Sequence, residues 1–219
     1  MKPLSLTLKN FGPYINETID FTKFEDSSLF LISGKTGSGK TTIFDGMSYA
    51  LFGESSGKLR LGKEMRSTFA DPSEATEVTL LFKHNEYLYE LNRLPEQELF
   101  KKRGTGVRKQ SAKISLIVKD AQGKELRAYS KRREVDELIQ ELLHLNANQF
   151  AQIVLLPQGE FRTFLIAKSD EKEKVLRNLF GTELYQLFSE NLKERLKIAN
   201  QEIQETQQKI ELKTEQLHW

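Results

Sequence analysis

Apolar and polar residues alternate in several short stretches of the chain, which is the pattern of a strand with one buried face. These stretches lie at residues 4–8, 19–21, 78–82, 87–91 and 112–118. A short polar turn at residues 84–86 joins two of them as a hairpin. The pattern predicts an antiparallel sheet built from residues 1–21 and 77–119.

A continuous apolar run at residues 29–32 differs from these stretches and is typical of a fully buried strand. A glycine-rich loop follows it, and apolar residues then recur at helical spacing from Ile43 to Leu51. Gly53 can end this helix in the left-handed conformation. The order strand, loop, helix predicts a mixed sheet around the loop.

The loop fits the phosphate-loop pattern of Gly, any four residues, Gly-Lys and Ser or Thr. It comprises Gly34, Lys35, Thr36, Gly37, Ser38, Gly39, Lys40, Thr41 and Thr42. Its glycines allow the backbone N–H groups to approach phosphate at the positive end of the helix dipole. Lys40 is then placed to reach the β- and γ-phosphates of ATP, and Thr41 to put its hydroxyl on Mg²⁺. The flanking strand and helix patterns argue against a chance match in a glycine-rich turn.

Helical patterns dominate from residue 131 onward, with a break at Pro157-Gln158-Gly159. Residues 183–219 contain neither proline nor glycine, and Leu196, Ile203, Ile210 and Leu217 repeat every seven residues. Such a repeat predicts a coiled-coil seam, although an amphipathic helix packed on the domain is the alternative. We expect one domain at residues 1–182 and the start of a truncated coiled coil at 183–219.

Composition excludes several classes of protein. The chain has no cysteine, which excludes a disulfide scaffold and a cysteine zinc site. No apolar run approaches membrane-spanning length, and the N-terminus lacks the pattern of a signal peptide. We therefore expect a cytoplasmic protein with no membrane contact.

The net charge of +2 conceals an asymmetry, because residues 101–133 carry +10 and the rest of the chain −8. A local basic excess favours a polyanion partner, while a solvated loop is an equally open alternative. The segment has no aromatic residue before Tyr129, so contact with a DNA backbone is expected without base stacking. The candidate DNA contacts flank two glycines in a predicted flexible loop; they are Lys101, Lys102, Arg103, Arg108 and Lys109.

Four stretches together carry a family resemblance: residues 8–14, residues 33–42 with Phe44-Asp45, residues 156–161, and residues 180–182 before the heptad helix. On them the chain resembles the SbcC family of coiled-coil DNA-repair ATPases, which are related to ABC transporters. The resemblance implies an α/β fold with α+β elements. This fold is the N-terminal lobe of an ABC-type P-loop ATPase head, joined to the base of a long antiparallel coiled coil.

The resemblance also implies roles for individual residues. Gln158 would complete the Mg²⁺ shell and sense the γ-phosphate, so that Lys40 and Gln158 are the expected catalytic residues. Archaeal relatives place a nucleotide-contacting arginine where Gly12 stands here. Other residues would then make that contact, and the candidates are Lys9, Asn10, Phe11 and Arg66.

The family's remaining motifs are absent from these 219 residues, which contain neither a Walker B run after Gln158 nor a Leu-Ser-Gly-Gly signature. The resemblance therefore implies three protein partners: the C-terminal lobe of the same full-length chain, a second ATPase head, and the nuclease subunit SbcD. ATP-driven head dimerisation would gate DNA binding, without sequence preference, and nuclease access at double-strand breaks and hairpins. The fragment alone is expected to be inactive as an ATPase.

Three other functions are weighed against this one. A chromosome-organising coiled-coil ATPase scaffold stays open. A transporter-type ABC nucleotide-binding domain is disfavoured, because such domains do not end in a heptad helix just after the glutamine loop. A small-molecule P-loop kinase is also disfavoured, because no lid or substrate acid is recognisable in the sequence.

Overall fold

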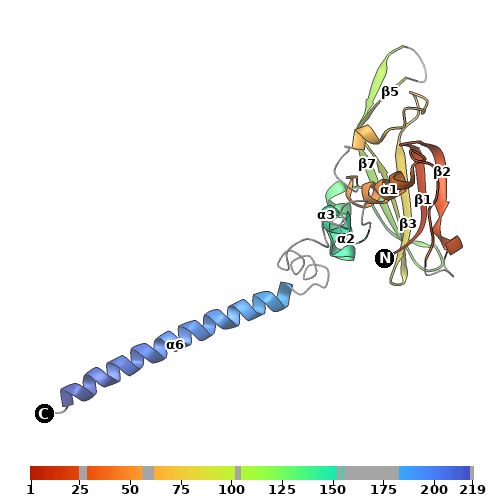
Figure 1. The fold of residues 1–219 in the computed structure, drawn as a ribbon. Helices are drawn as coiled ribbons and strands as arrows, with labels where there is room; N and C mark the ends of the chain where they lie inside the picture. Colours follow the sequence, from red (N-terminus) through yellow and green to blue (C-terminus); the bar gives the residue numbers. More distant parts are fainter. Residues whose placement is uncertain (25–28, 56–61, 102–104, 152–153, 155–182, 218–219) are drawn as a thin grey trace. The chain divides into compact units, whose positions relative to one another are not determined.

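The computed structural model describes residues 1–24, 29–55, 62–101, 105–151, 154 and 183–217 (Figure 1). The chain divides into two units, residues 1–167 and 168–219. The first unit is built on a six-stranded sheet, in the order β2-β1-β3-β4-β7-β8, in which every neighbouring pair is antiparallel. Its strands are β1 (Lys2–Phe11), β2 (Tyr14–Asp20), β3 (Glu77–His84), β4 (Tyr87–Leu94), β7 (Lys113–Lys119) and β8 (Glu125–Tyr129). The predicted antiparallel sheet is confirmed, and β8 extends it.

One face of this sheet carries the core. The register aligns Leu6 with Leu80, Leu80 with Leu91, and Leu91 with Leu116, and all four side chains are fully buried. The helix α1 (Lys40–Phe52) packs on β1, β3 and β4 (Figure 1). A Cβ added at Gly46 would lie 2.6 Å from Leu8 Cδ2, so α1 approaches the sheet too closely for a side chain there. The helix that follows the glycine loop is thus fixed against the core.

Arg93 of β4 joins this helix to the rest of the unit. Its guanidinium donates hydrogen bonds to the carbonyls of Ala50 and Leu51 in the last turn of α1. The same group pairs with Asp136 at 3.0 Å, in helix α2 (Arg132–Leu143). Burial lowers the pKa of Arg93, while the bond to Asp136 acts in the opposite direction. A buried cation at a helix C-terminus is stabilised by the helix dipole, so Arg93 connects the sheet, α1 and α2.

The predicted strand at residues 29–32 is wrong. These residues form no strand, and Leu29 and Leu31 are 87% and 88% exposed. A strand needs a neighbouring strand to accept its backbone hydrogen bonds, and an apolar run does not specify that neighbour. The predicted mixed sheet around the loop is therefore also wrong for the part of the chain that the structure describes, where both sheets are antiparallel.

The basic stretch at residues 101–109 was expected to be a loop, but from Val107 onward it belongs to a second, two-stranded sheet. Strands β5 (Gln97–Phe100) and β6 (Val107–Gln110) pair antiparallel, with Leu99 opposite Arg108. Leu99 is fully buried, and the Phe100 N–H donates to the carbonyl of Pro72. These contacts hold the strands in place, and the name "basic hairpin" is used below for residues 97–110.

The predicted helical region begins with α2 and the short helix α3 (Ala147–Phe150). Asn146 caps α3, because its side chain accepts a hydrogen bond from the Gln149 N–H while the Gln149 side chain accepts one from the Asn146 N–H. The remainder of the predicted region, including Gln158, falls in residues 155–182 and lies outside the described residues.

The second unit is described as one helix, α6 (Glu183–Leu217). Three residues of the heptad seam, Leu196, Ile203 and Ile210, are exposed along it. The helix is confirmed, whereas its pairing as a coiled coil and the boundary at residue 182 stay predictions. None of the described helices is both long and apolar enough to cross a membrane.

Candidate nucleotide-binding cleft

A cleft of about 580 Å³ opens beside the N-terminus of α1. Three segments of the first unit line it: the turn between β1 and β2, the phosphate loop, and residues 64–69, which overlap the end of the 3-10 helix η2 (Gly62–Met65). The lining residues are Gly12, Pro13, Thr36, Gly37, Gly39, Lys40, Thr41, Thr42, Glu64, Arg66, Thr68 and Phe69. The structure thus gathers on one cleft the phosphate loop and Arg66, which lie far apart in sequence.

The phosphate loop has the backbone that anion binding requires. Gly37 and Gly39 have φ angles of 86° and 94°, in the left-handed region that favours glycine. Helix α1 begins directly after Gly39, and no side chain caps it. The first N–H groups of a helix have no partner within the helix, and with the helix dipole they form a site for phosphate.

Lys40 folds back over the loop that precedes it. Its ammonium group donates hydrogen bonds to the carbonyls of Gly34, at 2.7 Å, and Lys35, at 2.9 Å. Phosphate oxygens carry more negative charge than carbonyl oxygens and form stronger bonds with an ammonium group. The ammonium group already lies at the loop, and its contact with a bound phosphate stays a prediction.

The turn between β1 and β2 supports the loop. The Tyr14 hydroxyl donates to the carbonyl of Gly39 at 3.2 Å, and burial raises the pKa of this tyrosine. A Cβ added at Gly39 would lie 2.6 Å from Pro13 Cγ, and one at Gly12 would lie 2.5 Å from Thr42 Cγ2. Sequence reasoning identified this stretch as a turn but not its role, since a Gly-Pro-Tyr turn carries no signal for what packs on it.

Residues 64–69 contribute a second wall of the cleft, and this segment is held to the end of β1. The Gly12 N–H donates to the Met65 carbonyl at 2.7 Å, and the Ser67 N–H donates to the Asn10 carbonyl at 2.8 Å. Between these two bonds, Arg66 and Phe11 form an antiparallel bridge. A short ladder thus fixes the wall relative to the turn that supports the loop.

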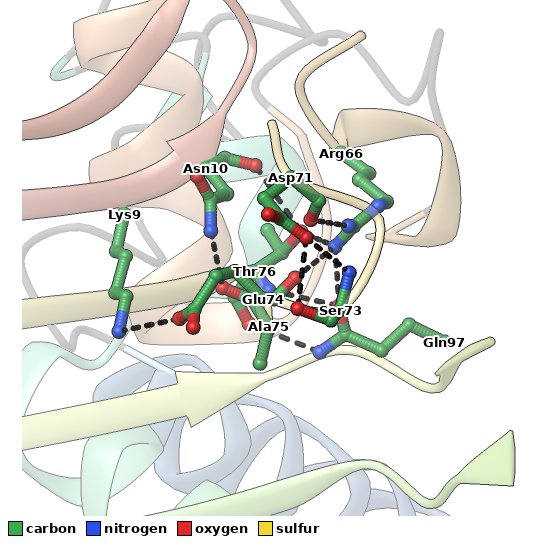
Figure 2. Close-up of polar contacts among 9 residues, drawn as sticks. All are labelled: Lys9, Asn10, Arg66, Asp71, Ser73, Glu74, Ala75, Thr76 and Gln97. Carbon is green, nitrogen blue, oxygen red and sulfur yellow. Dashed lines mark hydrogen bonds and ion pairs between the residues drawn. The ribbon is translucent and has the colours of Figure 1, made fainter. Parts of the chain in front are cut away.

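The guanidinium of Arg66 takes part in a polar network with the segment at residues 71–76 and Gln97 (Figure 2). Its guanidinium donates to the carbonyls of Asp71 and Glu74 at 2.9 and 2.7 Å, and to the side chain of Gln97 at 3.2 Å. Gln97 begins the basic hairpin and is itself bonded to the Thr76 backbone. Arg66 thus lines the cleft while its guanidinium binds the segment behind the wall, and its contact with nucleotide stays a prediction.

The other candidates at the end of β1 contact the protein. Asn10 is buried, and its side chain donates to the Ala75 carbonyl at 2.9 Å. Phe11 is fully buried against Tyr49, and Lys9 pairs with Glu74 at 3.4 Å. These contacts shape the wall of the cleft. Direct contact of Lys9, Asn10 or Phe11 with a nucleotide stays a prediction, as does the role of Gln158.

Sequence reasoning also missed three residues of the wall, Glu64, Thr68 and Phe69. They lie in η2 and in the irregular backbone that follows it, where neither spacing nor motif marks them.

The positive charge counted along residues 101–133 is partly offset in the structure, because several of these bases pair with acidic side chains. Lys109 pairs with Glu96 at 2.9 Å, and this bond raises the pKa of Lys109. Further bases of the segment pair with acids in the same way: Lys119 with Glu90, Lys131 with Glu134, Arg132 with Asp136 and Arg133 with Glu137. Lys101 and Arg108 are exposed, while Lys102 and Arg103 lie outside the described residues.

A glycine loop at the uncapped start of a core-packed helix, with a lysine over the loop, defines a P-loop nucleotide-binding protein. A family model described as "AAA domain" matches residues 5–218, which is nearly the whole chain. The chain belongs to this AAA domain family, whose membership implies nucleotide binding.

The chain is also similar to curated proteins named as the C subunit of the nuclease SbcCD. It is 46% identical over 197 residues to the one from Lactococcus lactis subsp. lactis (strain IL1403), covering 88% of this chain and 18% of the relative. It is 45% identical over 212 residues to the one from Staphylococcus aureus (strain MRSA252), covering 97% of this chain and 20% of the relative. The chain therefore spans about one fifth of the length of the curated relatives it matches.

One solved chain is described as "Structural biochemistry of ATP-driven dimerization and DNA stimulated activation of SMC ATPases". It overlaps 81% of this chain and 99% of its own length, with a TM-score of 0.43 and 16% identity.

Proposed function

We propose that this chain is the ATP-binding part of the ATPase subunit of a nuclease complex that processes DNA double-strand breaks and hairpins. The observation that carries the proposal is the phosphate-loop cleft, in a chain about 45% identical to proteins named as parts of a nuclease. The phosphate loop supports binding of a nucleotide, and the names of the relatives support a role for that binding in a nuclease complex.

ATP would bind with its phosphates on the loop from Gly34 to Thr42, and Lys40 would neutralise the β- and γ-phosphates. The cleft also suits Mg²⁺, because the exposed side chain of Thr41 offers a hydroxyl beside Lys40, and hydroxyl and amide oxygens are ligands of hard cations. Thr41 and Gln158 would hold the ion, which would offset the negative charge that develops during phosphoryl transfer.

The proposed catalytic site requires further protein. Leu29, Phe30 and Leu31 are exposed shortly before the phosphate loop, and such an apolar run is suited to pair as a strand and become buried. We assign this strand pairing to the C-terminal lobe of the full-length chain, which would also carry the catalytic carboxylate. A second ATPase head would supply the signature motif, so that ATP binding drives dimerisation of the heads.

The nuclease subunit SbcD would be the catalytic partner on DNA. The basic hairpin would contact duplex DNA through its phosphates, and therefore without sequence preference. The exposure of Lys101 and Arg108 supports this assignment, whereas the bond between Lys109 and Glu96 reduces the contribution of Lys109. A cytoplasmic location is part of the same proposal.

ATP turnover and DNA cleavage test this function. Residues 1–219 alone should show negligible turnover, and adding the C-terminal lobe should restore it together with ATP-dependent dimerisation. The full-length protein with its nuclease subunit should then cleave linear and hairpin-ended DNA only when ATP is present.

Two results would contradict the proposal. Robust hydrolysis by residues 1–219 that Lys40→Ala abolishes would show that the site needs no second lobe, since the activity of a contaminant would not respond to the substitution. ATP-dependent DNA clamping with no stimulation of the nuclease would instead favour the chromosome-organising scaffold.

A further inference from the structure

The wall of the cleft formed by residues 64–69 presents an aromatic ring. Phe69 is 72% exposed, and it is the only aromatic among the described residues that line the cleft. Its neighbours on this wall, Glu64, Arg66 and Thr68, are polar or charged. An exposed phenylalanine at a cleft offers a flat apolar surface that a ring of a bound ligand can cover.

The backbone that presents this ring is well anchored. Ser67 is buried, its N–H is bonded to the Asn10 carbonyl, and its hydroxyl accepts a hydrogen bond from the Phe69 N–H at 3.2 Å. The Ala70 N–H closes the turn on the Ser67 carbonyl at 3.4 Å. Phe69 therefore extends from a fixed turn at the cleft.

Arg66 secures the chain on both sides of that turn (Figure 2). Its backbone pairs with Phe11 before the turn, and its guanidinium binds the Asp71 and Glu74 carbonyls after it. A planar side chain on a backbone held at both ends loses little additional conformational freedom when it binds a flat ligand.

We propose that Phe69 is the platform on which the purine base of the bound nucleotide stacks. This inference rests on the proposed function, because it takes the phosphate loop as the site of the triphosphate. The loop and α1 account for the phosphates, and Phe69 supplies the aromatic surface that a purine ring requires. The nucleotide would thus bind with its phosphates at one wall and its base at the other.

The test separates the base from the phosphates. Isothermal titration of the full-length protein would compare ATP with inorganic tripolyphosphate, which has the phosphates and no base. Phe69→Ala should weaken ATP binding about tenfold, within the range measured for stacking of a base on an aromatic side chain. The affinity for tripolyphosphate should not change. Phe69→Trp should restore ATP binding, which excludes misfolding as the cause.

Tyr87→Ala is the matched control, because Tyr87 is another exposed aromatic, at the turn between β3 and β4 and outside the cleft lining. It should leave both affinities unchanged. Unchanged ATP affinity in Phe69→Ala would overturn the stacking role and leave the proposed function intact. Equal losses for ATP and tripolyphosphate would also overturn it, since Phe69 would then only shape the loop. Failure of the unaltered protein to bind ATP would overturn the proposed function itself.

Discussion

The phosphate loop and the basic segment both suggest an anion partner in the sequence, yet the structure treats them differently. In the loop, the groups proposed to bind phosphate are backbone N–H groups and Lys40, all within nine residues. Their geometry is set locally by glycines and by the start of α1. Such a motif can therefore be recognised from the sequence without knowledge of the residues that surround it in the fold.

The basic segment depends instead on which residues surround it. Its +10 charge was counted along the chain, but Glu90 and Glu96, which precede the segment, pair with Lys119 and Lys109. The α2 acids Glu134, Asp136 and Glu137 pair with its last three bases. A linear count of charge therefore overstates the positive surface, and only the tertiary structure identifies the bases left for a polyanion.

The largest expected effect is a loss of ATP binding, without a loss of DNA binding, when Lys40 of the phosphate loop is replaced. Lys40→Ala should weaken ATP–Mg²⁺ binding at least about a hundredfold, because two charged hydrogen bonds of roughly 1.5 kcal/mol each are lost. Isothermal titration of the two-lobe head measures this change. DNA binding measured without nucleotide should not change, since Lys40 is not part of the basic hairpin.

Lys83→Ala is the matched control, because Lys83 is an exposed lysine of β3 away from the cleft. It should leave ATP affinity unchanged. An unchanged affinity in Lys40→Ala would remove this lysine from the site and end the contrast between the two regions.

A medium effect compares two glycines that both have positive φ. Gly39→Ala and Gly106→Ala should each lose about 1–2 kcal/mol of stability from left-handed backbone. At Gly106 the new Cβ meets nothing within 4 Å, whereas at Gly39 it meets Pro13 and Tyr14. Gly39→Ala should therefore lose a further 1–3 kcal/mol, roughly the cost of overpacking, and also weaken ATP binding.

Denaturant unfolding of the two variants measures that difference directly. Equal losses of stability would show that the turn between β1 and β2 yields to the new methyl group. The turn would then give the phosphate loop no rigid support.

The smallest effect concerns the ion pair of the basic hairpin. Glu96→Gln removes the partner of Lys109, and the freed ammonium should steepen the slope of log affinity for duplex DNA against log salt by up to about 0.9. Replacing Lys101 and Arg108 together with Gln should flatten the slope by up to about 1.8. Filter binding or fluorescence anisotropy over a salt series measures both.

Glu86→Gln controls for net charge, because Glu86 is an exposed acid in the turn between β3 and β4. It should not change the slope. If Glu96→Gln and the double variant also leave the slope unchanged, the hairpin is only a solvated surface, and the basic excess needs another partner.

Much of the sheet was predictable, because alternation reports which face of a strand is buried and needs no knowledge of its neighbours. Leu6, Leu80, Leu91 and Leu116 follow that pattern and form one buried row. The prediction of a strand at residues 29–32 was wrong, because a buried strand needs a neighbouring strand and an apolar run does not indicate which segment that is. The strand β6 was not predicted, because glycines and charged residues are typical of a loop. The pairing of β5 with β6 is held by the burial of Leu99 and by the hydrogen bond to the Pro72 carbonyl, which no sequence pattern indicates.

The cleft likewise has one part that the sequence predicts and one part that it does not. The phosphate loop was predictable from its motif, whereas the wall was not, because it depends on a ladder between residues 10–12 and 65–67. Arg66 was identified as a candidate, but its bonds to the Asp71 and Glu74 carbonyls come from backbone geometry that no residue pattern encodes. Asn10 and Phe11 likewise gave no indication in the sequence that they would be buried.

The pairing of β1 with β3 has a consequence for synthesis of the chain. Leu6 lies opposite Leu80, so the first strand cannot complete its hydrogen bonds until β3 has left the ribosome. The phosphate loop and α1 are synthesised between these two strands. Their contacts with Pro13 and Tyr14 come from the turn between β1 and β2, which is synthesised earlier. Closing so long a loop before its contacts form is slow. Because α1 also packs on β3 and β4, the phosphate loop gains its full support for a nucleotide only after both of these strands have been made.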